Sequence, residues 1–97
     1  MRARFVLVVG GLAVVLSACG HPATEQECEL IFRRSAEVAL VATKVTNPQE
    51  IERAVAEARA AKGKAILDGC VGKRITDSAL SCVKEATTAE ALDRCLQ

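Results

Sequence analysis

The sequence predicts an all-α fold, a small bundle of about four helices that disulfides staple together. Three observations support this prediction. Apolar residues recur at helical spacing after residue 24, capping signals precede the expected helices, and an even set of cysteines follows residue 19. No run shows the alternation of a β-strand, and no internal repeat is present. The expected arrangement is a two-helix antiparallel hairpin followed by a shorter C-terminal helical hairpin.

The first 18 residues are expected to be a secretory signal rather than part of this fold. Arg2 and Arg4 form a basic start, and the run 5–16 is apolar and interrupted only by two glycines. A membrane-spanning helix needs about 20 apolar residues, whereas shorter runs are typical of signal peptides. The sequence therefore predicts a signal peptide over residues 1–18.

The end of this stretch, Leu16-Ser17-Ala18-Cys19, resembles the lipobox of bacterial lipoproteins. In that family the cysteine is acylated, with palmitate among the usual acyl chains, and the chain is cut just before it. The resemblance implies that Cys19 is the lipidation site and the first residue of the mature protein. Ordinary secretion, with cleavage after Gly20, is the alternative, because small residues also precede that bond.

Removal of the signal leaves a single small domain whose charges nearly balance. Arg2 and Arg4 leave with the signal, so the 13 basic residues fall to 11 against 12 acidic ones. The chain contains no Trp or Tyr. This composition argues against a nucleic-acid partner, which would need a basic surface or stacking aromatics. Residues 19–24 are expected to form a flexible lipidated tether with a solvated His21, and residues 25–97 the helical domain.

The first two helices are expected over residues 25–45 and 48–70. Thr24 and Glu27 match a capping box, and Asn47 with Pro48 forms a stop followed by a new helix start. The expected buried stripes are Cys28, Ile31, Phe32, Ser35, Val38, Ala39, Ala42 and Val45 in the first helix, and Ile51, Val55, Ala58, Ala61, Ala65 and Ile66 in the second. Gly63 is a weak spot that costs ~1 kcal/mol against Ala.

The C-terminal hairpin is expected to consist of helices over residues 77–86 and 88–96. Thr76 is a cap candidate for the first, and the run 87–90 (Thr-Thr-Ala-Glu) matches a second capping box. The residues expected to face inward are Ala79, Leu80, Cys82, Val83, Ala86, Leu92, Cys95 and Leu96.

The four cysteines after Cys19 are expected to form two disulfides in an oxidising compartment. In the first hairpin, Cys28 and Cys70 both lie at the end away from the turn, and Cys82 and Cys95 flank the turn of the second hairpin. The predicted pairs are Cys28–Cys70 and Cys82–Cys95, with Cys28–Cys82 and Cys70–Cys95 as the alternative. The spacings lack the close cysteine pairs of a zinc site, so no metal is expected.

The cysteine spacing in the last third of the chain is similar to that of small cysteine-containing helical lipoproteins of Gram-negative bacteria. It reads Cys70-x11-Cys82-x12-Cys95. Those proteins mostly lack a known activity, so the resemblance implies no functional residue.

A non-catalytic role is expected, because the single histidine lies outside the helices and no nucleophile has a base beside it. No cofactor is expected. The predicted function is a membrane-anchored envelope lipoprotein that acts as a binding or accessory module for a protein partner. A structural envelope lipoprotein and an inhibitor or immunity-type lipoprotein are the alternatives. In the lipoprotein sorting scheme, Asp after the acylated cysteine retains a protein at the inner membrane, so Gly20 implies the periplasmic face of the outer membrane.

One charged cluster remains in the second half of the chain. Its members are Arg59, Lys62, Lys64, Lys73 and Arg74, opposed only by Asp68. They are expected either to face anionic lipid headgroups or an acidic partner, or to form an ordinary solvated surface.

Overall fold

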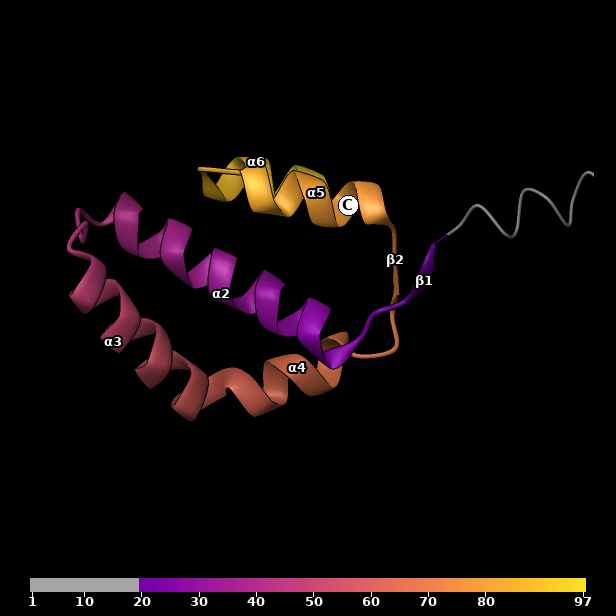
Figure 1. Ribbon diagram of the computed structural model, residues 1–97, viewed down its shortest axis with the longest axis horizontal. Coiled ribbons are helices and arrows are strands. Elements are labelled where there is room, and N and C mark those ends of the chain that lie inside the picture. The colour runs from indigo at the N-terminus through magenta and orange to yellow at the C-terminus, as the bar shows by residue number, and fades with distance from the viewer. Residues whose placement is uncertain (1–19) are drawn as a thin grey trace, which may run out of the picture.

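The computed structural model describes residues 20–97, which form a small all-α bundle as predicted (Figure 1). Helix α2 runs through the middle of the molecule. One helical segment lies along one side of it and a short hairpin along the other (Figure 1). The elements are α2 (Glu25–Ala42), α3 (Pro48–Ala58), η1 (Arg59–Gly63), α4 (Lys64–Cys70), α5 (Asp77–Glu85) and α6 (Ala89–Leu96).

Two very short strands tie the start of this region to the loop that follows α4. Strand β1 (His21–Pro22) pairs antiparallel with β2 (Arg74–Ile75), with His21 opposite Ile75. The prediction that the chain contains no strand is therefore wrong here. Two-residue strands are too short to produce the alternation by which a strand is recognised in a sequence.

The predicted helix starts are mostly confirmed by their caps. The Thr24 hydroxyl accepts the amide of Glu27, and the Glu27 carboxylate accepts the amide of Thr24, which completes the capping box. Asn47 accepts the amides of Gln49 and Glu50, with Pro48 as the first helical residue. Thr76 caps α5, as predicted. The last helix starts at Ala89, one residue later than predicted, because Thr88 and not Thr87 is its N-cap.

Helix α2 ends at Ala42, three residues before the predicted end. Lys44 adopts φ +72°, its amide bonds to the Val41 carbonyl, and the Val45 amide bonds to the Leu40 carbonyl, both at 3.0 Å. These two bonds form a Schellman motif, which usually has Gly at the left-handed position. A lysine there gives no stop signal in the sequence, so the end of the helix was not predicted.

The core consists of two clusters on different parts of α2. One cluster joins α2 to the C-terminal hairpin and contains Val38, Val83, Ala86, Leu92 and Cys95. The other lies at the N-terminal end of α2, against α4, and contains Ala23, Cys28 and Leu67. Phe32 and Val55 are also buried.

Several residues expected on buried stripes are instead exposed. Helix α2 is covered from two sides, so its buried residues do not follow one continuous stripe. In α6, the last residue, Leu96, is 46% exposed. The exposed residues are Ser35, Ala39, Ala42, Ala61, Ala65, Ile66, Cys82 and Leu96.

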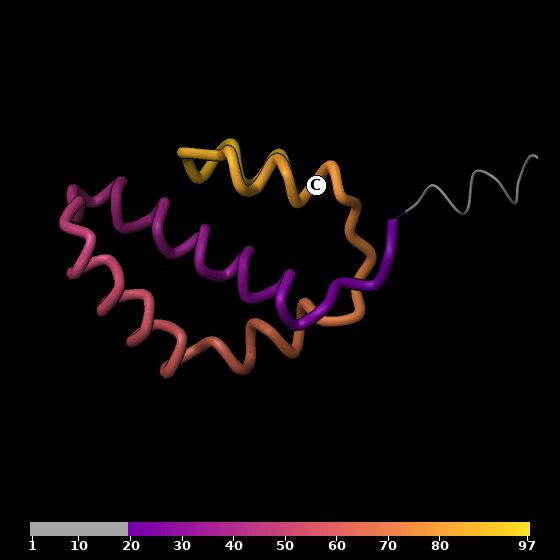
Figure 2. Tube along the Cα trace, in the orientation of Figure 1, coloured from indigo at the N-terminus to yellow at the C-terminus, as the bar shows by residue number. Residues whose placement is uncertain are grey.

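The buried face of the second helix shifts because the π-helical segment η1 interrupts it. A π-turn inserts one residue into the helical repeat. Beyond η1 the buried position therefore moves from Ile66, which is 48% exposed, to Leu67, which is 5% exposed. The chain also bends at η1, between α3 and α4 (Figure 2). Gly63 lies in this segment, so the predicted weak spot marks a break in the α-helix.

Candidate functional site

The residues next to the predicted lipidation site form a structured end of the domain. Cys19 itself lies outside the described residues. Gly20 follows it with φ +89°, and its carbonyl accepts a hydrogen bond of 2.9 Å from Nη1 of Arg74. A Cβ at this glycine would collide with the carbonyl group of Ile75. Both its backbone angle and its surroundings therefore require glycine at this position.

We call residues 20–24 the strap, because they are bound to the loop that follows α4. The Ala23 amide donates to the Lys73 carbonyl at 2.7 Å, and the Ala23 carbonyl accepts from the Gly72 amide at 2.9 Å. The Ala23 side chain is 5% exposed. The prediction of a flexible tether is therefore wrong for residues 20–24. Their backbone hydrogen bonds are made with residues about 50 positions away, which local sequence patterns do not reveal.

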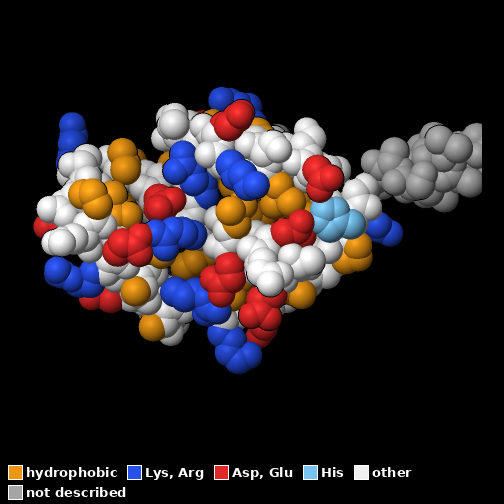
Figure 3. All heavy atoms as spheres, viewed as in Figure 1, with side chains coloured by type: hydrophobic (Ala, Val, Ile, Leu, Met, Phe, Trp, Pro, Cys, Tyr) orange, Lys and Arg blue, Asp and Glu red, His pale blue; other side chains and the backbone are white. Residues whose placement is uncertain are grey.

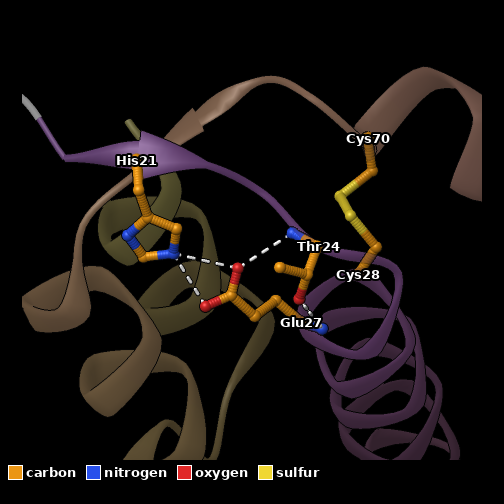
Figure 4. Close-up of a disulfide and its surroundings, with 5 residues drawn as sticks. All are labelled: His21, Thr24, Glu27, Cys28 and Cys70. Carbon is orange, nitrogen blue, oxygen red and sulfur yellow. Dashed lines mark hydrogen bonds and ion pairs between the residues drawn. A yellow bond between two sulfur atoms is a disulfide. The ribbon is translucent and has the colours of Figure 1, made fainter.

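His21 is bound to the first turn of α2 rather than freely solvated (Figure 4). Its Nε2 lies 2.8 Å from Oε2 and 3.0 Å from Oε1 of Glu27, and its Nδ1 lies 3.9 Å from Asp77. The hydrogen bond from the Thr24 amide, followed by that from His21, lowers the pKa of the Glu27 carboxyl group. Glu27 thus links the helix cap and the strap, a role that the capping-box pattern alone does not indicate.

The disulfide Cys28–Cys70 lies beside this network (Figure 4). Its Cα atoms are 6.0 Å apart, and Cys28 is 2% exposed. The second disulfide joins Cys82 to Cys95, whose Cα atoms are 5.6 Å apart. These are the two pairs that the sequence predicts. Among the described residues, no group of His, Cys, Asp or Glu side chains is arranged to hold a metal ion.

The predicted basic cluster does not form a single surface, because three of its members bind different partners. Arg74 donates to the Gly20 carbonyl, and the other two form ion pairs. Arg59 contacts the Glu29 carboxylate through Nε at 2.9 Å and Nη2 at 2.6 Å, which lowers the pKa of Glu29. Lys64 pairs with Asp68 at 3.2 Å. On the face shown in Figure 3, basic and acidic side chains are interspersed. The expectation of a solvated, mixed surface fits this half of the cluster.

A groove of about 390 Å³ lies between α2 and α3. Phe32 and Val55, both buried, line it together with charged residues. Arg59 pairs with Glu29, and Arg33 pairs with Glu52, so two ion pairs connect the helices along the groove. Sequence reasoning missed this groove, because it depends on the distance between two helices rather than on any motif.

Comparison with protein families, curated proteins and solved structures finds no match to this chain. None of the helices between residues 20 and 97 is long and apolar enough to cross a membrane. The function must therefore be inferred from the residues themselves.

Proposed function

We propose that this chain is a lipoprotein of the bacterial envelope, anchored at the periplasmic face of the outer membrane through acyl chains on Cys19. The main supporting observation is the use of the cysteines. Two disulfides occupy four of the five cysteines, and Cys19 is the remaining one. An odd cysteine in an exported protein needs a use, and acylation provides one.

The domain acts as a non-catalytic binding or accessory module for a protein partner in the envelope. His21, the one histidine, is bound to Glu27, and the cysteines of the domain are used as cross-links. This arrangement supports a scaffold rather than a catalytic centre. An inhibitor or immunity-type lipoprotein is one form of such a module.

The groove between α2 and α3 favours a binding role over a purely structural one. Its volume of about 390 Å³ falls within the range of ligand-binding clefts. It combines an apolar pair, Phe32 and Val55, with paired charges at Arg59–Glu29. Protein interfaces commonly have this composition, with apolar residues surrounded by polar ones.

Lipidation is tested by intact-mass analysis of the membrane fraction. The mature chain should comprise residues 19–97 and carry acyl chains on Cys19, and two or more such signals give stable anchoring. Cys19→Ser should abolish the added mass. Cys82→Ser, in a chain that keeps Cys19, should retain it. A soluble wild-type product starting at His21 would contradict the proposal. Density-gradient separation then distinguishes the outer from the inner membrane.

Partner binding is tested with a photo-reactive amino acid placed in the groove of the full chain in cells. Ala56 lines the groove and is exposed, whereas Ala60 is exposed in η1 outside its lining. We expect a cross-linked product of one defined mass from position 56 and none from position 60. Identical patterns from both positions, or none from either, would favour the structural alternative.

A further inference from the structure

The strap holds the start of the domain next to an exposed loop of mixed apolar and basic character. This loop, Val71–Arg74, follows α4 and is bound to the strap by the backbone hydrogen bonds of Ala23. Arg74 also donates to the Gly20 carbonyl. Neighbouring Cα atoms are only ~3.8 Å apart across a trans peptide bond. An anchor on the residue before Gly20 therefore holds Ile75, which pairs with the strap beside Gly20, at the membrane surface. Ala23, which binds the loop, lies three residues after Gly20, at most ~11 Å along the chain. The loop is thus held near the same surface.

The side chains of the loop match the chemistry of a phospholipid surface. Val71 is 46% exposed although it is apolar, and Lys73 and Arg74 are both exposed. A guanidinium group has five N–H donors, and the bond to Gly20 leaves others free for phosphate groups. Apolar side chains beside Lys and Arg are typical of segments that lie at the boundary between headgroups and acyl chains.

Two acidic side chains near the strap, Glu27 and Asp77, lie close to His21 rather than to the basic residues of the loop. Glu27 lies 2.8 Å and Asp77 3.9 Å from the ring nitrogens of His21. Glu27 also accepts the hydrogen bond from the Thr24 amide, so its carboxylate is directed toward the strap. Asp77 is nevertheless 96% exposed, and Glu25 and Asp68 line the same hollow as Val71. The loop Val71–Arg74 itself contains no acidic residue, so its own contribution to a phosphate-rich surface is the charge of Lys73 and Arg74.

We propose that the domain docks on the phospholipid surface through the loop Val71–Arg74, so that α2 projects away from the membrane. This inference rests on the proposed lipidation of Cys19. The disulfide places Cys70 beside Cys28, in the first turn of α2. Val41, near the other end of α2, lies thirteen residues further along, which is ~20 Å at the helical rise. The turn between α2 and α3 is then the part that faces the periplasm.

The chain offers a clean spectroscopic test, because it contains no Trp. Val71→Trp and Val41→Trp form a matched pair, since the two valines are 46% and 48% exposed. Val71 caps α4 beside the start of α2, and Val41 lies near the end of α2. Each lipidated full-length variant is reconstituted into vesicles of phosphatidylethanolamine and phosphatidylglycerol with brominated acyl chains. Interfacial segments are buried by ~5–10 Å, so we expect at least roughly twofold stronger quenching at position 71.

The contribution of charge is tested in the Val71→Trp background. Lys73→Gln should reduce the quenching, and Lys44→Gln, in the turn after α2, should leave it unchanged. Equal quenching at positions 71 and 41 in protein that floats with the vesicles and carries acyl chains would overturn the docking alone. Protein that neither floats nor carries acyl mass would overturn the lipidation, and the docking with it.

Discussion

Removing the disulfide Cys28–Cys70 should destabilise the domain more than removing Cys82–Cys95. The change is a pair of double variants, Cys28→Ala with Cys70→Ala and Cys82→Ala with Cys95→Ala. A cross-link stabilises chiefly by restricting the unfolded chain, and its effect grows with the length of the closed loop. The sequence separations are 42 and 13 residues.

For these separations, the loop-entropy relation gives stabilisation of ~4 kcal/mol for the longer loop and ~3 kcal/mol for the shorter one. Both cross-links have one buried cysteine, Cys28 at 2% and Cys95 at 9% exposed, so the expected difference comes from the loop lengths rather than from burial. Small domains have total stabilities of about 5–15 kcal/mol. Loss of the longer cross-link therefore removes a large fraction of the free energy of unfolding.

Guanidinium denaturation followed by far-UV circular dichroism measures both effects, since the chain has no Trp or Tyr for fluorescence. With an m-value of roughly 2–3 kcal/mol/M, a difference of ~1 kcal/mol separates the midpoints by about 0.3–0.5 M. The variant that lacks Cys28–Cys70 should have the lower midpoint, or be unfolded in water. A lower midpoint for the variant that lacks Cys82–Cys95 would refute the reasoning.

Two further predictions concern the strap. Gly20→Ala should reduce the protection of the Ala23 amide in hydrogen exchange more than Gly72→Ala does, because both glycines have positive φ but only the first lacks room for a Cβ. Equal loss of protection would show that the backbone angle alone matters. The hydrogen bond from the Thr24 amide is the main cause of the lowered pKa of Glu27. The ionised carboxylate therefore stabilises the fold at pH values above 4.5, the ordinary pKa of the group. This stabilisation is lost as the pH falls through the lowered pKa. Glu27→Gln should make the denaturation midpoint less sensitive to acid, and an unchanged pH profile would contradict this assignment.

Helix starts could be predicted from the sequence because their signals are local. A hydroxyl or amide side chain at the cap bonds to amides two or three residues ahead, as Thr24, Asn47 and Thr76 do. The arrangement of the cysteines could also be predicted, because a short connection at Asn47 forces neighbouring helices to be antiparallel. The first disulfide then follows from similar distances to the turn.

The features that escaped prediction depend on contacts between distant residues or on rare local geometry. Lys44 ends α2 in a conformation that usually belongs to glycine, so its residue type gives no warning. The π-helical segment η1 inserts one residue before α4. Gly63 marks this segment as a weak spot, but a single glycine does not indicate the change of register. This insertion turns Leu67 and Cys70 toward α2, where Cys28 lies. The predicted disulfide is thus formed in the structure through a change of register that the periodicity argument did not include.

Gly20, next to the predicted lipidation site, has two independent explanations, one from the sequence and one from contacts between distant residues. The lipoprotein resemblance interprets Gly20 as a permissive sorting residue, because it is not Asp. The structure supplies a separate reason, since φ is +89° and a Cβ would meet the Ile75 carbonyl. Gly20→Asp would therefore release the strap as well as change any sorting signal. Gly20→Ala separates the two causes, because it releases the strap without adding an acid. A change of membrane caused by Asp but not by Ala would be due to sorting, and a change caused by both would be due to the loss of the strap.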